Sequence, residues 1–195
     1  MINLSSLTTK YRASLIAQGY RTWIKSNKRY LDVGCGNGIV TGYLVKTLKI
    51  NIIGCDILYY LHSNIPFRKM SSINKLPFKD NSFDGVMIND VLHHMSYENQ
   101  TKILEESFRV AKKVLIFEEE PTLSAKIFDY LLNRIHNSEM NIPLSYRTEA
   151  EWKKLFKLMS FKYKTEIVRK SFWYPFSHIA FLVYPANTGD KNDKD

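Results

Sequence analysis

A short apolar strand, a glycine-rich turn and an amphipathic helix follow one another near the N-terminus and constrain the fold of this chain most. The strand is YLDVG (30–34), the turn is CGNG, and the helical pattern is GIVTGYLVKTL (38–48). Glycines permit close backbone approach, and a helix N-terminus offers free N–H groups. A strand–turn–helix unit of this kind binds a nucleotide in an open α/β sheet. A dinucleotide-binding G-x-G-x-x-G pattern would need glycine at Ile39, so the pattern here is instead D-x-G-x-G-x-G.

The rest of the chain continues the alternation of strands and helices. Near-continuous apolar strands separated by helices predict a parallel sheet covered on both faces, βαβαβαβαβαββ in outline. Only the last two strands lie close enough in sequence to pair as an antiparallel hairpin. Thr148 and Glu151 form a capping box that predicts a helix start. The expected strands are 51–55, 67–70, 83–88, 114–119, 161–170 and 178–184, and the expected helices are 10–26, 98–111, 123–135 and the segment after Thr148.

Length and composition limit the class of protein. A chain of 195 residues with 45% apolar residues predicts one domain. No apolar run approaches the ~20 residues of a membrane span, and the N-terminus lacks the apolar region of a signal peptide. Cys35 and Cys55 cannot by themselves form a disulfide framework or a zinc site, and His62, His136 and His178 have no metal-ligand spacing. We therefore expect a cytoplasmic protein without a metal.

The formal net charge of +9 comes from the two ends of the chain. Residues 1–31 contain basic residues and no acidic ones, whereas the middle of the chain is nearly balanced. Such charge can attract RNA, anionic lipid or a phosphorylated substrate. We favour the simpler interpretation, a lysine-rich surface that keeps the protein soluble.

Three segments in the right order resemble class I S-adenosylmethionine-dependent methyltransferases, in particular the type 11 group. LDVGCGNG (31–38) resembles their first motif, with Asp56 about 20 residues further on. NKLPFKDNSFDGVMINDVLHHM (74–95) resembles their LPF-x-D-x-SFD stretch ending in LHH, and EESFRVAKKVLIFE (105–118) resembles a later block. The resemblance implies S-adenosylmethionine as cofactor and a Rossmann-like, doubly wound, mostly parallel seven-stranded sheet with a C-terminal antiparallel hairpin. It implies one domain over 1–186, with a helical cap (1–28), an acceptor-recognition insert (122–147) and a polar tail (187–195).

The resemblance also implies which residues contact the cofactor. Asp32, Gly34 and Gly36 would contact the methionine part, and Asp56 would accept both ribose hydroxyls. Ile57 would pack on adenine, while Asn89 and Val91 would line the sulfonium. Ser72 stands where the family has an acidic residue that binds the adenine amino group. The remaining predicted cofactor contacts are Cys35, Asn37, Gly38, Ile73 and Asp90.

The candidate catalytic residues follow the fourth strand. His94, or less favourably His93, is a candidate general base because an imidazole titrates near neutral pH; alternatively, LHH is a structural part of the cofactor pocket. Glu118, Glu119 and Glu120 either orient the acceptor or form a solvated strand end. Tyr146 and Arg147 are acceptor contacts or part of a helix-entry turn.

Three functional hypotheses remain open. The favoured one is a methyltransferase acting on a small-molecule or lipid-like acceptor. The second is a tRNA or other RNA methyltransferase, since the LPF and LHH motifs also occur in tRNA modifiers and the basic ends suit phosphates. The third is a non-catalytic partner subunit that keeps the fold.

Overall fold

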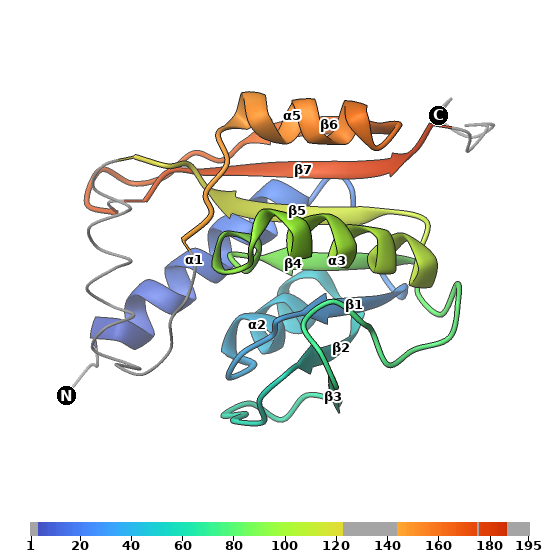
Figure 1. The fold of residues 1–195 in the computed structure, drawn as a ribbon. Coiled ribbons are helices and arrows are strands. Elements are labelled where there is room, and N and C mark those ends of the chain that lie inside the picture. The colour runs from blue at the N-terminus through green and yellow to red at the C-terminus, as the bar shows by residue number, and fades with distance from the viewer. Residues whose placement is uncertain (1–3, 123–143, 175, 187–195) are drawn as a thin grey trace.

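The computed structural model describes residues 4–122, 144–174 and 176–186, which form one seven-stranded sheet (Figure 1). The strand order is β3-β2-β1-β4-β5-β7-β6. The strands from β3 to β5 are parallel, while β7 is antiparallel to both β5 and β6. The bounds are β1 Arg29–Val33, β2 Asn51–Asp56, β3 Phe67–Lys69, β4 Gly85–Asn89, β5 Val114–Glu119, β6 Phe161–Ile167 and β7 His178–Pro185.

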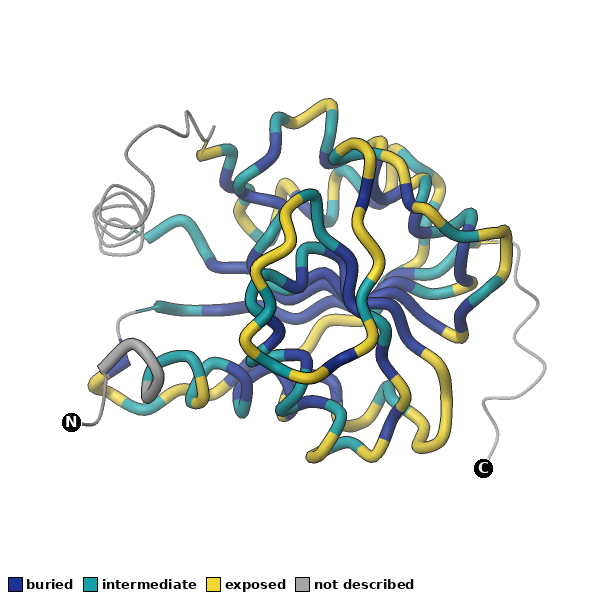
Figure 2. Tube along the Cα trace, turned by 90° about the horizontal axis from the view of Figure 1, so that it is seen from below, coloured by how far each residue is buried: buried dark blue, intermediate teal, exposed yellow. Residues whose placement is uncertain are grey.

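Helices cover both faces of the sheet, which confirms the predicted doubly wound arrangement. Side chains alternate along each strand, so Val86 and Ile88 of β4 join the core under α3 and α5, whereas Met87 joins the core under α1 and α2. Figure 2 shows the strands as a buried layer between partly exposed helices. The bounds are α1 Leu4–Tyr20, α2 Ile39–Leu48, the 3₁₀ turn η1 Leu92–His94, α3 Tyr97–Val110 and α5 Glu149–Leu158.

The C-terminal strands pair more extensively than a simple hairpin. β7 lies between β5 and β6, although β6 precedes it in sequence. Burial explains the order, because the first four residues of β7 are buried, whereas β6 is mostly exposed. An exposed, polar strand is tolerated at a sheet edge, where one row of backbone groups faces water.

Several element boundaries differ from the sequence-based predictions. The first helix is Leu4–Tyr20 instead of 10–26, because the chain must turn at Asn27 (φ 57°) to enter β1. The predicted order βαβαβαβαβαββ places a helix between β2 and β3 and another between β3 and β4. The described segments 57–66 and 70–84 contain no helix. Pro77 lies inside the second segment, and proline breaks a helix interior, whereas Pro66 ends the first segment directly before β3. The capping box at Thr148 is confirmed, with Thr148 as the N-cap of α5.

Two predicted segments cannot be compared with the structure. The expected helix 123–135, with most of the insert 122–147, and the tail 187–195 lie outside the described residues. Among the helices that are described, none combines the length and the apolar character needed to cross a membrane.

The parallel strands bring their carboxyl ends to one edge of the sheet. Val33 of β1 is in register with Ile88 of β4, and Asn89 is in register with Phe117 of β5. The glycine turn after β1, the residues after β4 and the glutamates ending β5 therefore meet at the same edge. Ligands of open α/β sheets bind at this edge, where the strand order reverses.

Candidate functional site

The turn after β1 adopts a conformation that glycine favours. Gly34, Gly36 and Gly38 have φ values of 72°, 55° and 75°. A Cβ on Gly34 would lie 2.6 Å from Val91 Cγ2, so the turn packs directly against the residues after β4. The backbone N–H groups of Gly34 and Cys35 both donate to the Cys55 carbonyl at the end of β2. The glycines thus let the turn pack closely against the end of β2 and the residues after β4.

Asp56 holds the outer part of this turn. Its Oδ2 accepts a hydrogen bond of 2.9 Å from the Gly36 N–H, and its Oδ1 accepts one from the Leu58 N–H. The carboxylate thus stands directly beside the glycine turn, where it can also accept hydrogen bonds from a ligand.

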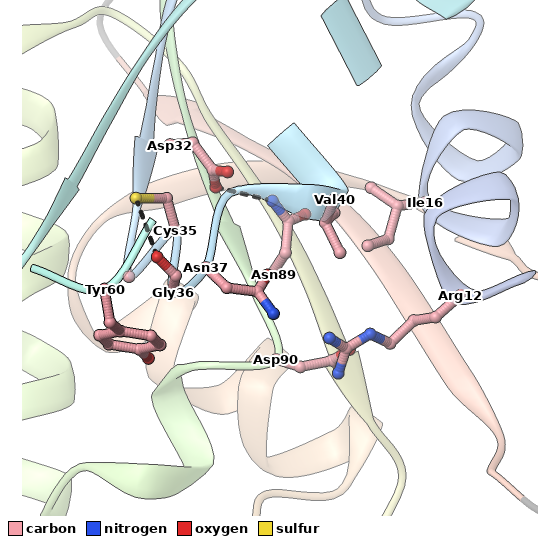
Figure 3. A pocket seen from close by; sticks show the side chains of 11 residues that line it. Arg12, Ile16, Asp32, Cys35, Gly36, Asn37, Val40, Tyr60, Asn89 and Asp90 are labelled. Atoms are coloured by element: carbon pink, nitrogen blue, oxygen red, sulfur yellow. Dashed lines mark hydrogen bonds and ion pairs between the residues drawn. The ribbon is translucent and has the colours of Figure 1, made fainter. Parts of the chain in front are cut away.

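A cavity of about 200 Å³ opens next to the glycine turn (Figure 3). Its wall includes Arg12 and Ile16 from α1, one helical turn apart, together with Tyr60 from the loop after β2. Figure 3 shows Arg12 reaching from α1 toward Asp90, with 3.5 Å between Arg12 Nη1 and Asp90 Oδ2. The other lining residues are Asp32, Gly34, Cys35, Gly36, Asn37, Val40, Asn89 and Asp90.

A buried hydrogen-bond chain forms the floor of the cavity. Thr41 Oγ1 donates to Asp32 Oδ2 at 2.6 Å, and Asn89 Nδ2 donates to Asp32 Oδ1 at 3.0 Å. The Tyr20 hydroxyl donates to Asn89 Oδ1, which fixes the orientation of that amide. Burial raises the pKa of Asp32 to about 6, against the lowering effect of the Thr41 and Asn89 hydrogen bonds. A cationic ligand in the cavity would favour the ionised carboxylate.

Glu118 at the end of β5 holds the LHH turn in place. Its Oε1 accepts hydrogen bonds from the Val91 and Leu92 N–H groups at 2.9 and 2.7 Å. Its Oε2 lies 2.6 Å from His93 Nδ1. Glu118 and Glu119 are buried, so the idea that they form a solvated strand end is wrong: the end of β5 is covered by η1 and β7.

His93 lies enclosed in this arrangement. Its ring stacks on Tyr146 with centroids 5.0 Å apart and is only 3% exposed. Burial alone lowers the pKa of His93, but the Glu118 carboxylate outweighs that effect and raises the pKa to about 9. The pair is therefore an imidazolium and a carboxylate at neutral pH. His94 is half-buried, and its ring contacts that of His93 at a tilt of 53°, with centroids 4.0 Å apart.

The comparisons with known proteins agree with this geometry. Residues 31–116 match the family described as "Methyltransferase domain". A solved S-adenosylmethionine-dependent methyltransferase from Aquifex aeolicus superposes with a TM-score of 0.65 at 20% identity, covering 93% of each chain. Over residues 31–116 this chain is thus similar to a methyltransferase domain, and its fold resembles that of a solved S-adenosylmethionine-dependent methyltransferase.

Other proteins that are similar to this chain have less specific descriptions. A chain from the complex between the Haloferax volcanii Trm112 methyltransferase activator and a methyltransferase has a TM-score of 0.68 at 14% identity, covering 93% of each chain. An uncharacterized protein of Haemophilus influenzae is 27% identical over 76% of this chain and 62% of its own length. One from Methanocaldococcus jannaschii is 36% identical over 48% of this chain and 47% of its own length. The chain thus spans about half to three-fifths of the length of these curated relatives.

The structure brings most of the predicted cofactor contacts together. Asp32, the turn residues 34–37, Asn89 and Asp90 line one cavity. Asp56, Gly38 and Val91 flank this cavity through the glycine turn. Ile57 packs against the core cluster under α3 and α5.

Ser72 and Ile73 lie apart from the cavity lining. Ser72 is exposed, and its hydroxyl donates to Asn74 Oδ1. His93 and His94 are also outside the lining, on the 3₁₀ turn that follows Asp90 and Val91. The predicted set therefore divides into a cavity group and residues around it.

The predicted acceptor residues join the LHH turn to α3. Tyr146 stacks on His93, and Arg147 Nε donates to Gln100 Oε1 at 2.7 Å. The Gln100 amide in turn donates to the Leu92 carbonyl. These contacts support the turn that enters α5.

Sequence reasoning missed four lining residues, Arg12, Ile16, Val40 and Tyr60. Arg12 and Ile16 are four residues apart in the basic N-terminal segment, and that spacing was the available signal that one face of the helix points into the site. The sequence offers no comparable signal for Tyr60. His178 was also missed, because β7 brings it to Asp90 from far along the chain.

Proposed function

We propose that this chain transfers the methyl group of S-adenosylmethionine to a small-molecule or lipid-like acceptor. The observation that carries the proposal is the cavity in which the glycine turn meets the hydrogen-bonded Asp32–Asn89 pair at the ends of β1 and β4. The cofactor supplies a methyl group on a positively charged sulfur, and the acceptor displaces it in line as the carbon–sulfur bond breaks. The protein's main tasks are then positioning and exclusion of water.

The residues around the cavity fit this cofactor chemically. Gly36 leaves backbone open to the ligand, with only the Tyr60 hydroxyl 3.4 Å from where its Cβ would lie. Asp32, Asn89 and the turn would hold the methionine and sulfonium part. Asp56 would accept the ribose hydroxyls through the oxygen atoms that already meet the turn. Ionised Asp32, Asp56 and Asp90 provide negative potential for a cationic molecule.

His94 is the proposed general base for acceptors that carry a proton. Glu118 and Tyr146 fix His93, and His93 in turn contacts the ring of His94. His93 is then a positioning residue whose own Nδ1 is engaged by Glu118. His94 would remove the acceptor proton while the acceptor lone pair forms the new bond to the methyl carbon.

A product assay tests the proposal directly. Purified chain is incubated with S-adenosylmethionine and a panel of metabolites, lipid dispersions and a tRNA pool, and S-adenosylhomocysteine is measured. We expect acceptor-dependent product from a metabolite or lipid. The matched control Glu166→Gln, an exposed side chain on β6, should behave as wild type.

The other outcomes identify the alternatives. Product only with tRNA, together with a gel shift that weakens steeply with salt, would indicate the RNA methyltransferase. Cofactor binding without product from any acceptor would contradict the proposal and favour a non-catalytic partner subunit.

A further inference from the structure

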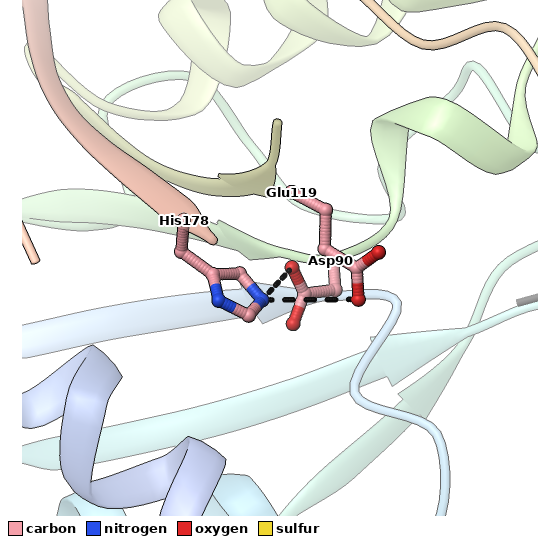
Figure 4. Close-up of side chains that lie close together, drawn as sticks. All are labelled: Asp90, Glu119 and His178. Carbon is pink, nitrogen blue, oxygen red and sulfur yellow. Dashed lines mark ion pairs between the residues drawn. The ribbon is translucent and has the colours of Figure 1, made fainter. Parts of the chain in front are cut away.

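Three potential metal-binding side chains converge beside the cofactor cavity (Figure 4). Asp90 follows β4, Glu119 ends β5, and His178 begins β7, so three neighbouring strands each contribute one group. Their side chains are 4%, 8% and 1% exposed. One donor atom from each lies within 4.8 Å of the others.

These side chains face one another at distances that are long for hydrogen bonds. His178 Nε2 lies 3.4 Å from Asp90 Oδ1 and 3.8 Å from Glu119 Oε1. Protein N–H···O hydrogen bonds are typically about 2.7–3.2 Å. Within the described part of the chain, neither ring nitrogen of His178 and neither carboxylate oxygen of Asp90 has a hydrogen-bond partner. Buried polar groups are normally satisfied, so a ligand between Asp90 and His178 would supply the partners that these two side chains lack.

The spacing of the donor atoms suits a metal ion. A divalent cation such as Zn²⁺ binds nitrogen and oxygen at about 2.0–2.2 Å, and two ligands of a tetrahedral ion at that distance are then about 3.4 Å apart. The two distances from His178 Nε2 are close to this value. The ring is also held in place, because it stacks on Phe117 with centroids 4.5 Å apart.

We propose that Asp90, Glu119 and His178 bind a divalent transition-metal cation such as Zn²⁺ or Mn²⁺. One imidazole and two carboxylates form a mixed nitrogen and oxygen donor set, which suits these ions better than Mg²⁺, whose sites use oxygen. Arg12 faces Asp90 Oδ2, which leaves Asp90 Oδ1 directed at His178. Arg12 supplies one positive charge against two carboxylates, so the cluster retains negative charge for the cation.

The location links the cation to the neighbouring cavity. Asp90 belongs both to the cluster and to the cavity lining. A cation there would bind a hydroxyl or carbonyl oxygen of a molecule approaching from that side and favour its deprotonated or polarised form. The binding proposal itself is independent of methyl transfer and is tested without cofactor or acceptor.

Metal binding by the full chain tests the proposal. Chelator-treated protein is dialysed separately against Zn²⁺, Mn²⁺ and Mg²⁺, and bound metal is measured by elemental analysis, with melting temperature as a second readout. We expect about one Zn²⁺ or Mn²⁺ per chain and a raised melting temperature. Mg²⁺ should bind at least tenfold more weakly.

Two variants remove ligands, and one serves as control. Glu119→Gln preserves shape, and His178→Phe preserves the stacking on Phe117, so both should fold by circular dichroism while binding metal at least tenfold more weakly. His62→Gln replaces an exposed histidine outside the cluster and should bind as wild type. Sub-stoichiometric binding of all three metals, or undiminished affinity in the folded Glu119→Gln variant, would overturn the proposal. Equal affinity for Mg²⁺ would exclude His178 as a ligand.

Discussion

Asp32 combines two properties that conflict, since its charge suits a cationic ligand but its burial disfavours that charge. Its pKa is raised to about 6 from an ordinary value of 3.8. The folded chain without ligand therefore holds an ionised carboxylate at neutral pH at a cost in stability. Functional sites often retain groups of this kind because the ligand requires them.

We predict that Asp32→Asn stabilises the ligand-free chain relative to wild type as pH rises. Because the folded pKa is raised, the unfavourable contribution is absent below about pH 4, grows as pH rises, and is complete above about pH 6. Its upper bound is about 3 kcal/mol, from 1.36 kcal/mol per pKa unit. Chemical denaturation of both proteins from pH 4 to 8 measures the difference.

The same variant should bind S-adenosylmethionine more weakly at pH 7, because it lacks the carboxylate. A stability difference that does not change with pH would show that Asp32 ionises at its ordinary pKa and would contradict this account.

We predict that His94→Ala lowers turnover at least tenfold at saturating cofactor and leaves the S-adenosylmethionine dissociation constant unchanged. A general base contributes typically ~10²–10⁴-fold, and it acts only on the acceptor side. Steady-state kinetics and calorimetry separate the two quantities. His93→Ala is the informative comparison, because it leaves Glu118 buried without its imidazolium and should lose thermal stability as well. Wild-type turnover in His94→Ala would remove His94 as the base.

At the scale of elements, Gly36 is required in the glycine turn for its backbone conformation more than for lack of space. A Cβ on Gly36 would meet only the Tyr60 hydroxyl at 3.4 Å, but its φ of 55° is one that side chains disfavour. Left-handed backbone costs roughly 1–2 kcal/mol for a residue with a Cβ. A bulky residue there also covers the backbone that a ligand would approach.

We predict that Gly36→Val abolishes S-adenosylmethionine binding while the chain stays folded. Gly42→Ala in α2 is the matched control, because its Cβ would have ordinary contacts of 3.6 Å to Ser63. Alanine is favoured over glycine in a helix by about 1 kcal/mol, so the control should melt slightly higher and bind normally. Thermal melts with and without cofactor report both effects, and normal binding by Gly36→Val would place the pocket elsewhere.

The 3₁₀ turn η1 should make stability depend on pH in the alkaline range. The pKa of His93 is raised to about 9, so its ion pair with Glu118 is fully present below pH 6.5 and is lost as pH rises through 9. The contribution is on the order of 3 kcal/mol. We predict that wild type loses stability across this interval and that Glu118→Gln loses much less. Chemical denaturation at several pH values measures the free energy of unfolding of both proteins. A wild-type stability that stays constant up to pH 9 would contradict the pairing of His93 with Glu118.

Local signals explain which elements the sequence predicted well. The strand 114–119 and the start of α5 at Thr148 carry strong apolar or capping patterns, and both match the structure. The N-terminal helix was displaced, because helical periodicity continues past Tyr20 into residues that actually turn toward β1. Such boundaries depend on where the next strand must begin, and a local pattern does not contain that information.

At the scale of the whole molecule, contacts between segments that are distant in the chain could not be predicted from the sequence. Motif order predicted the cavity group around Asp32 and the glycine turn, since those residues follow recognisable strands. The position of β7 between β5 and β6 was not predictable from sequence order, and it alone brings His178 to Asp90 and Glu119. Arg12 likewise reaches Asp90 only because α1 packs on the face of the sheet that carries Met87 and Phe117.

The central claim is that the cavity beside the glycine turn binds S-adenosylmethionine through Asp56 and the turn. Calorimetric titration of S-adenosylmethionine into wild type and Asp56→Ala tests it most directly, with circular dichroism to verify folding. A hydrogen bond to a charged group contributes about 1.5–3 kcal/mol, and about 1.4 kcal/mol is a tenfold change in affinity. We predict saturable binding to wild type at one site and at least tenfold weaker binding to Asp56→Ala. No binding to folded wild type, or equal affinity in the two proteins, would contradict it.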